Sequence, residues 1–376
     1  MRMMQQPFFD DKKILVVDKS QKNKNDRTWC FWEKEADIFE DIIYHKWQHL
    51  NFFSKLYSSK LDIAPYTYKM IRGIDFYDYV LKEAEKKNNI SFLYDDVQKN
   101  FTENNTGIVE TSNGTYTAQY IFTSVIGDDK KFLFEENSQS KPKGIYTMLQ
   151  HFKGWMIETE ADVFDVNTAG FMDFRVEQNR GTTFVYVLPV SPKNALIEYT
   201  LFNEKLLASS DYDDALKKYI SQFLHINSYT IIEEEYGLIP MSNYSFKQQE
   251  GRVINLGTAG GQTKASSGFT FKFIQKQTKN ITQQLAQNRL LHLSSSFNKR
   301  KFDLYDAVLL NVLHNNKMGG DEIFSQIFKK NPPQRVLSFL DNETNLWEDL
   351  KILSGVPTHI FMPAALHEFI KGFGRK

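Results

Sequence analysis

The carboxyl group best suited to proton chemistry is Glu198, in the apolar stretch of residues 195–202. This stretch is predicted to be a strand, in which side chains alternate between two faces. Leu196, Glu198, Thr200 and Phe202 share one face, and neither face is polar. A carboxyl group in such surroundings has a raised pKa and stays protonated near neutral pH, so it can act as a general acid. The alternative is an edge-strand glutamate exposed to water.

Two further carboxylates stand among apolar or acidic neighbours. Asp173 lies between Met172 and Phe174 and is followed by Arg175. It could serve as a base or could hold Arg175 in an ion pair. Glu235 ends a run of three glutamates, and its sequence surroundings give less support for a catalytic role.

A glycine-rich segment, residues 251–268, could bind phosphate or the edge of a flavin. It holds five of the 19 glycines of the chain. It contains a short predicted strand, residues 252–256, and precedes a predicted helix, residues 271–285. A strand, a glycine turn and a helix start together expose backbone N–H groups to an anion. The alternative is a close-packed turn without a ligand.

Residues 13–18 are predicted to form a buried parallel strand that ends in Asp18. In dinucleotide-binding folds, an acid at such a strand end binds the ribose hydroxyls. These folds also need an earlier strand and a G-x-G-x-x-G turn, whereas residues 1–12 hold no glycine and their first six residues resemble the end of a helix. We therefore expect that the first strand and its glycine turn are missing, through an internal methionine taken as the start, a truncated gene or a relic.

His45 and His49 have a spacing that can hold zinc on a helix, and residues 37–61 are predicted to be a helix with a loop. The glutamate of an H-E-x-x-H motif is missing and no third ligand is evident, so no metal site is predicted.

Composition limits the remaining classes of function. The 46 basic and 46 acidic residues cancel, which gives no electrostatic case for nucleic acid. The single cysteine, Cys30, excludes an internal disulfide and fits a reducing compartment. We find neither a stretch long enough to span a membrane nor a signal peptide. The 376 residues suggest two or three domains, with strands over residues 144–202 and helices after residue 287.

Six blocks, in order along the chain, resemble the signatures of the bacterial lycopene cyclase family. They are residues 25–33 (NDRTWCFWE), 68–77 (YKMIRGIDFY), 171–175 (FMDFR), 188–189 with 195–200 (LP and ALIEYT), 235–241 (EYGLIPM), and 257–264 with 267–271 (GTAGGQTK and SGFTF). On these blocks the chain is identified as a member of that family.

The resemblance implies an α/β flavoprotein fold: a glutathione-reductase-like FAD/NAD(P)-binding fold, truncated at the N-terminus, with an inserted mixed α+β substrate domain and a helical C-terminal region. The implied FAD-binding domain comprises residues 1–45, 70–143 and 240–285. The substrate-binding domain comprises residues 46–69 and 144–239, and the helical region residues 286–376.

The resemblance also implies the activity. Members close the ends of lycopene into β-rings, through γ-carotene to β-carotene, by acid–base chemistry that needs reduced FAD but causes no net oxidation. NADPH is the usual reductant. The substrate is dissolved in membrane, so a cytoplasmic enzyme bound peripherally to the inner face of the cell membrane is expected, with lycopene and other carotenoids as its partners.

By the same resemblance, Glu198 is the catalytic acid, while Asp173 remains a second catalytic candidate on the strength of its apolar neighbours alone. The cofactor would contact Asp18 at its ribose and Arg72 near the flavin. It would also contact the glycine turn, through Gly257, Gly260, Gly261 and Thr263. Trp29 and Trp32 either line the pocket or belong to the core.

Two other readings remain open. The chain could be a flavin-dependent monooxygenase or reductase on the same fold, or an inactive truncated remnant. Without the first glycine turn, the polypeptide is expected to bind FAD poorly, because the pyrophosphate normally rests on that turn.

Overall fold

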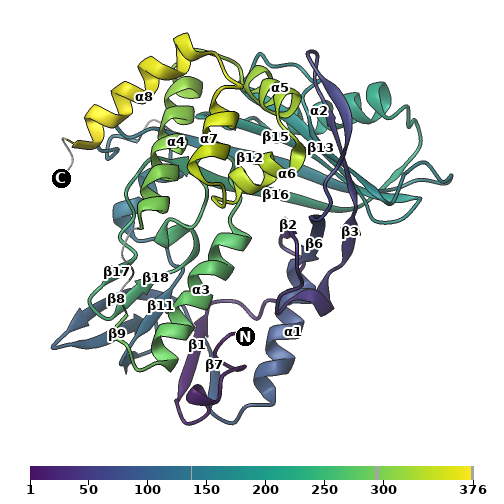
Figure 1. Cartoon of the computed structure of the whole chain (residues 1–376). Coiled ribbons are helices and arrows are strands. Elements are labelled where there is room, and N and C mark those ends of the chain that lie inside the picture. Colours follow the sequence, from purple (N-terminus) through teal and green to yellow (C-terminus); the bar gives the residue numbers. More distant parts are fainter. Residues whose placement is uncertain (137, 292, 294–295, 374–376) are drawn as a thin grey trace.

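A large mixed sheet and the C-terminal helices form one end of the molecule, and smaller parallel strand pairs form the other (Figure 1). The computed structural model describes residues 1–136, 138–291, 293 and 296–373. The fold is mixed α/β, which is the class expected from the sequence.

The large sheet has seven strands, in the order β16-β12-β15-β14-β13-β4-β5. They come from two separate segments of the chain, residues 49–62 and 147–242, while the domain bounds implied by the resemblance stay a prediction. Their bounds are β4 (His49–Phe53), β5 (Ser58–Asp62), β12 (Thr147–Glu158), β13 (Thr168–Asp173), β14 (Thr182–Pro189), β15 (Asn194–Asn203) and β16 (Thr230–Ser242).

Strand β15 confirms the predicted alternation. Leu196 and Phe202 belong to one core cluster, together with Trp32 and residues of the C-terminal helices. Ile197 and Tyr199 belong to a second cluster on the opposite face, under α2 (Ser209–Phe223). The sheet is therefore covered on both sides, because both faces of its central strands are apolar.

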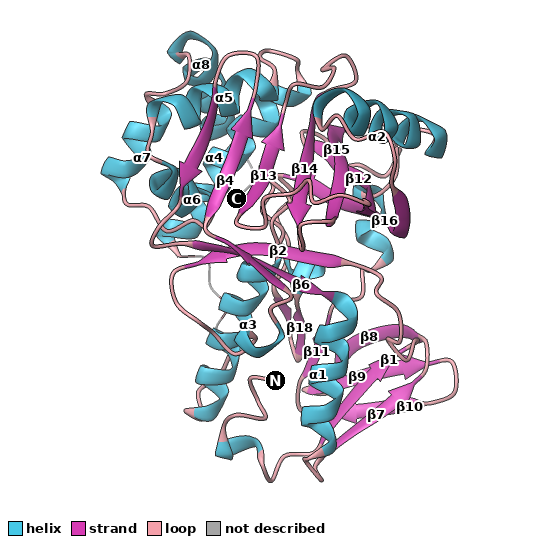
Figure 2. Ribbon diagram, turned by 90° about the vertical axis from the view of Figure 1, so that its right-hand side faces the viewer, coloured by secondary structure: helices cyan, strands magenta, loops and turns pink. Residues whose placement is uncertain are grey.

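Beneath the first face run β2 (Thr28–Glu33) and β6 (Thr67–Arg72), which cross between the two ends of the molecule (Figure 2). They form a three-stranded sheet with β3 (His45–Trp47). The helix predicted within residues 37–61 is wrong: apart from one 3-10 turn, this region forms β3, β4 and β5. The burial of β4 alternates with a period of two, which is a strand pattern. His45 and His49 thus lie on two strands rather than on one turn of a helix.

The other end holds two parallel strand pairs. β1 (Ile14–Asp18) pairs with β7 (Ile90–Tyr94), and β11 (Ile121–Thr123) pairs with β18 (Val253–Asn255). Leu15 is 42% exposed and Val16 38%, so the prediction that this strand is buried is wrong. Within the described residues β1 pairs only with β7, which leaves its other edge uncovered.

The remaining elements complete this end. The first residues form turns rather than the expected end of a helix. The bounds are η1 (Pro7–Phe9), η2 (Glu40–Ile42), α1 (Gly73–Glu85), β8 (Val97–Glu103), β9 (Thr106–Thr111), β10 (Thr115–Ala118), η3 (Asp128–Leu133), β17 (Gln249–Glu250), η4 (Gly257–Gly260) and α3 (Phe271–Ala286).

The C-terminal helices confirm the predicted helical region. They are α4 (Phe297–His314), α5 (Gly320–Lys330), α6 (Pro333–Leu340), α7 (Leu346–Leu353) and α8 (Thr358–Phe373). Helix α8 is held against α4 by a buried cluster in which Glu368 accepts hydrogen bonds from Tyr146 and Asn311, each at 2.8 Å.

Asp173 fastens α2 to the sheet. Its carboxylate is fully buried and receives two bonds from the Arg175 guanidinium, at 2.5 and 2.9 Å, and one from the Tyr219 hydroxyl, at 2.7 Å. Met172, just before it, has a φ of +58°, and the strand register shifts at this point. This bulge turns Asp173 toward α2, away from the face that carries Glu198.

We expect Asp173→Asn to lower the stability of the protein, because it leaves a partly buried guanidinium without its counter-charge. Breaking a buried pair costs 3–5 kcal/mol, and the partial exposure of Arg175 reduces this to about 2 kcal/mol, a fall of several degrees in Tm. Thermal unfolding measures it. The control is Asp214→Asn on α2, whose side chain is 80% exposed; equal Tm values for the two variants would contradict the anchoring role.

Candidate active site

Four residues form a row across four neighbouring strands. Glu235 of β16 lies opposite Gly154 of β12, which lies opposite Glu198 of β15, which in turn lies opposite Tyr186 of β14. A Cβ on Gly154 would come within 3.0 Å of the Glu235 side chain and 3.1 Å of Leu196. A side chain here would press on Glu235 and Leu196, so glycine gives Glu235 the room to reach across β12.

The two glutamates meet over this glycine, close enough for each carboxyl group to shift the pKa of the other. Each also accepts a hydrogen bond from a threonine. Thr200 Oγ1 donates to Glu198 Oε1 at 2.7 Å, and Thr28 Oγ1 donates to Glu235 Oε2 at 2.8 Å. The pair is thus fixed by side chains of three different strands, which makes its geometry well defined.

Both glutamates are partly exposed, yet the surrounding protein desolvates them, and this desolvation governs the protonation of the pair. Desolvation raises the pKa of Glu198 well above its usual value, and the neighbouring charge of Glu235 raises it further. Desolvation also raises the pKa of Glu235, although the hydrogen bond from Thr28 and the interaction with Glu198 oppose this. Glu198 is therefore the group that keeps its proton near neutral pH.

The titratable groups nearest Glu198 are uncharged as well. Cys30 of β2 and Tyr68 of β6 lie close enough for each to shift the pKa of the other, and Tyr186 lies beside Glu198 on the sheet. Burial raises the pKa of all three well above their usual values. None of the groups that shift the pKa of Glu198 is a cation. This absence explains why its carboxyl group remains protonated.

Aromatic rings surround the same face of the sheet. Trp32 packs edge-on against Phe269 at 4.6 Å and against Phe171 at 6.2 Å, and Phe171 lies 5.6 Å from Tyr68 and 5.8 Å from Tyr186 between ring centroids. Trp32 is buried and donates to the Leu337 carbonyl, so it belongs to the core. Ring faces of this kind stabilise a cation that forms among them.

A small cavity of about 20 Å³ borders Glu235 and is lined also by Asn25, Thr28, Arg72 and Glu233. This volume is about that needed for one water molecule. The Arg72 guanidinium is engaged by Asp75 through bonds of 2.7 and 2.8 Å and lies 4.0 Å over the Tyr44 ring. The expected contact of Arg72 with a flavin stays a prediction.

The glycine segment forms the predicted strand, tight turn and helix: β18, η4 and α3. Gly257 and Gly261 have φ of +57° and +70°, and a Cβ on Gly260 would lie 2.1 Å from the Asn255 carbonyl oxygen. Thr263 links the Thr258 and Thr270 hydroxyls at 3.0 and 3.1 Å. The turn thus depends on its glycines and leads into a helix N-terminus that has no side-chain cap.

Two buried polar atoms near this turn have no partner among the described residues, Ser267 Oγ and Gln150 Oε1. Gln150 Oε1 lies close against Gly268, 1.9 Å from where a Cβ would stand. Orphaned polar atoms beside an uncapped helix start fit a polar ligand such as the flavin dinucleotide. Asp18 ends β1 as predicted, and its carboxylate accepts from the Ser20 N–H at 2.9 Å; its role toward a ribose remains a prediction.

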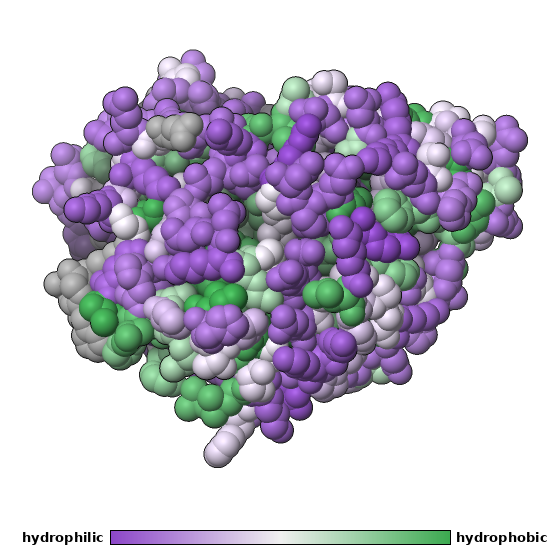
Figure 3. Space-filling model, turned by 90° about the horizontal axis from the view of Figure 1, so that it is seen from above, coloured by the Kyte–Doolittle hydropathy of each residue, from purple (hydrophilic) through white to green (hydrophobic). Residues whose placement is uncertain are grey.

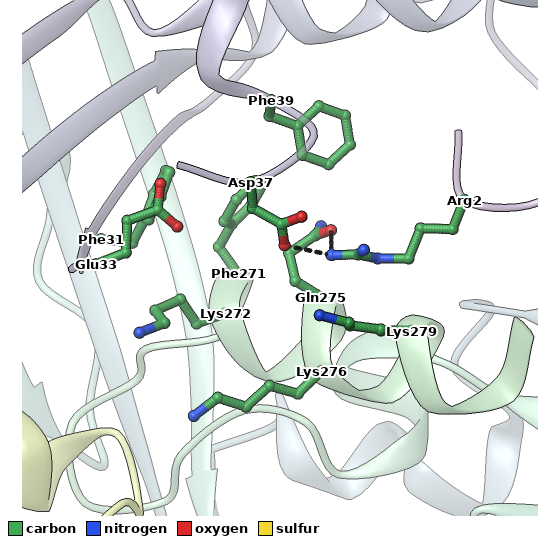
Figure 4. A pocket seen from close by; sticks show the side chains of 10 residues that line it. All are labelled: Arg2, Phe31, Glu33, Asp37, Phe39, Phe271, Lys272, Gln275, Lys276 and Lys279. Carbon is green, nitrogen blue, oxygen red and sulfur yellow. Dashed lines mark hydrogen bonds and ion pairs between the residues drawn. The ribbon is translucent and has the colours of Figure 1, made fainter. Parts of the chain in front are cut away.

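A larger cavity of about 160 Å³ lies between α3 and the start of the chain (Figure 4). Arg2, Lys272, Lys276 and Lys279 line it, and Arg2 is bonded to Asp37 at 2.6 Å. The sequence analysis missed this cavity, although the lysine spacing along one helix face was a visible signal. It contains none of the predicted site residues.

Comparison with known proteins agrees with the geometry. The family model described as lycopene cyclase protein matches residues 10–366. A comparison with curated proteins gave no match.

Similar solved structures include a flavoprotein/dehydrogenase from Cytophaga hutchinsonii, with a TM-score of 0.60 and 11% identity over 98% of this chain and 95% of that one. A geranylgeranyl bacteriochlorophyll reductase-like protein from Thermoplasma acidophilum has a TM-score of 0.59 and 10% identity, over 96% and 98%. A triple mutant of the flavin-dependent brominase Bmp2 also has a TM-score of 0.59, with 10% identity over 98% and 95%. At these identities the likeness concerns the fold alone, which is that of flavin-dependent enzymes. With a family match over nearly its whole length and this fold, the chain belongs to the lycopene cyclase family.

Proposed function

We propose that this protein is a lycopene β-cyclase, which closes the ends of lycopene into β-rings through γ-carotene to β-carotene without net oxidation. The observation that carries the proposal is the position of Glu198, a partly exposed carboxyl group beside Glu235 on a sheet face lined with aromatic rings, where desolvation and the Glu235 charge raise its pKa. Family membership supplies the substrate class.

The chemistry demands such a group. An alkene is a very weak base, so its protonation needs an acid that water cannot neutralise. Glu198 would give its proton to the terminal alkene carbon, and the electrons of a second double bond would then close the ring. The resulting cation would be stabilised by the faces of rings such as Phe171 and Tyr186, until a neighbouring carbon loses a proton. One proton enters and one leaves, so the substrate mass is unchanged.

Glycine-turn residues would hold the proposed cofactor, FAD. Gly257, Gly260, Gly261 and Thr263 would face its phosphates or flavin edge, and Asp18 its ribose. When bound in its reduced form, with NADPH as reductant, FAD supplies negative charge that stabilises a carbocation.

The second candidate is a flavin-dependent monooxygenase or reductase, which the fold of the neighbouring structures favours. A cyclase leaves the substrate mass unchanged, a monooxygenase adds one oxygen atom, and a reductase adds hydrogen. An inactive remnant would give no product at all. Product mass therefore distinguishes the candidates.

Contact with the membrane is part of the proposal, since a long polyene is dissolved there. No helix in the described ranges is long and apolar enough to cross a bilayer. Helix α8 nonetheless exposes apolar side chains to solvent: Met362, Leu366 and Ile370 are 62%, 61% and 62% exposed. On α7 Trp347 is 76% exposed. Figure 3, which shows the molecule from above, has patches of hydrophobic surface among the polar side chains. We propose that this α7–α8 surface rests in the lipid interface.

Replacing Glu198 with Gln should abolish cyclisation. Glutamine keeps the size of the side chain but has no acidic proton, and general acid catalysis is worth about 10²–10⁴-fold. The measurement is the carotenoid profile of cells that make lycopene. Glu158→Gln, at an exposed end of β12, is the control and should leave the profile unchanged. Normal conversion by the Glu198 variant would show that another group is the acid.

Replacing Thr263 with Val should weaken FAD binding by about 3–10-fold, the value of one lost hydrogen bond. Titration of FAD fluorescence measures the affinity. Thr278→Val, whose hydroxyl bonds only within α3, is the matched control. An unchanged Kd for the Thr263 variant would remove the turn from the proposed cofactor site.

Replacing Leu366 and Ile370 together with Gln should reduce binding to phosphatidylcholine–phosphatidylglycerol vesicles by at least 10-fold. Each buried leucine-sized side chain contributes about 1.5–3 kcal/mol. Vesicle flotation measures the bound fraction. The control is Leu56→Gln, which is 56% exposed but lies between β4 and β5. An equal loss of vesicle binding in the double variant and in Leu56→Gln would show that the membrane contact lies elsewhere.

A further inference from the structure

We propose that Glu235 is a positioning residue that shares a single proton with Glu198 across Gly154 and exchanges that proton with water. The inference rests on the proposed cyclase function and assigns a second residue to its acid chemistry. Sequence alone places these two glutamates 37 positions apart, and only the register of three strands brings them together.

The first support is geometric. Gly154 is the residue between the two glutamates in the cross-strand row, and its missing side chain gives Glu235 the room to reach Glu198. Threonine hydroxyls donate to Glu198 Oε1 at 2.7 Å and to Glu235 Oε2 at 2.8 Å, which holds both carboxyl groups in place beside one another. Double ionisation of two carboxyl groups so close is strongly unfavourable, so the pair retains one proton in the resting protein.

The second support is the small cavity beside Glu235; both glutamates are partly exposed, but only Glu235 lines this cavity. Glu235 borders the small cavity together with Asn25 and the exposed Glu233, whereas Glu198 does not line it. The side chain of Asn25 donates to Glu233 Oε2 at 2.9 Å, so the mouth of this cavity is polar. A proton from water can therefore reach Glu235 without crossing the aromatic face on which a cation would form.

These features define the proton balance. Glu198 gives its proton to the alkene carbon, a C–H bond forms, and the pair becomes doubly ionised. A doubly ionised pair is strongly basic, because removing one of two adjacent negative charges is favourable. It takes back the proton that the ring carbon sheds, and Glu235 exchanges this proton with solvent. No net proton and no electron is consumed.

The test compares Glu235→Gln with Glu235→Asp by two readouts. Activity requires protonated Glu198, so it falls as pH rises through the pKa of that group. Replacing Glu235 with Gln removes a negative neighbour and lowers this pKa. We expect the alkaline limit of kcat to move down by at least one pH unit, with a tenfold loss of kcat for each unit above it and little change in KM. The Asp variant should restore part of the shift.

The titratable groups around the pair, Cys30, Tyr68, Tyr186 and Glu233, are unchanged in both variants. The control is Glu234→Gln on the same strand, whose carboxylate faces Lys153 at 3.1 Å and should not move the limit. An unshifted pH limit in Glu235→Gln, or a loss confined to KM, would overturn the proposal.

Infrared spectroscopy of the wild-type protein and its variants tests the pair independently of activity. The protein should keep a protonated carboxyl absorption at pH 8 that disappears in Glu198→Gln and titrates at lower pH in Glu235→Gln. If lycopene is not converted but this pattern is found, the shared proton stands and the cyclase function fails. An absorption that titrates identically in wild type and Glu235→Gln would overturn the shared proton whatever the activity.

Discussion

The structure around the site depends on the desolvation of one partly exposed carboxyl group, Glu198, without a cation beside it. Desolvation and the charge of Glu235 both disfavour an ionised Glu198, and the protein avoids this by keeping the group protonated. The same constraint accounts for its neighbours. Cys30, Tyr68 and Tyr186 are polar enough to fill the space yet remain neutral, and Gly154 leaves room for a second carboxyl group.

The two faces of the large sheet have different roles: one carries the proposed catalytic group, and the other carries an ion pair that stabilises the fold. Glu198 lies on the face that meets β2, β6 and the aromatic cluster, whereas Asp173 lies on the face that meets α2. An ion pair with Arg175 fixes Asp173, so its geometry favours the structural role that the sequence left open. The two carboxyl groups differ because one has a cationic partner and the other has a second acid.

Local patterns in the sequence predicted much of this arrangement. The alternation of residues 195–202 correctly assigned the two faces of β15, and the glycine-rich turn between β18 and α3 was expected from its spacing. The pairing of Glu198 with Glu235 could not be predicted, because it depends on the register of β16, β12 and β15.

The sequence analysis missed two other features: the face on which Asp173 lies and the strands β3 to β5. The left-handed backbone at Met172 turns Asp173 to the α2 face, which strict strand alternation would not place there. Strands β3 to β5 were predicted as helix because their aromatic residues obscured a period of two.

The central claim is that a protein carboxyl group, in exchange with water, protonates the polyene. The most direct test is the mass and deuterium content of the product formed from lycopene by the reduced, FAD-loaded protein in deuterated water. The account predicts an otherwise unchanged mass with one deuterium incorporated per ring. A product that carries an added oxygen atom, or rings without deuterium, would contradict it.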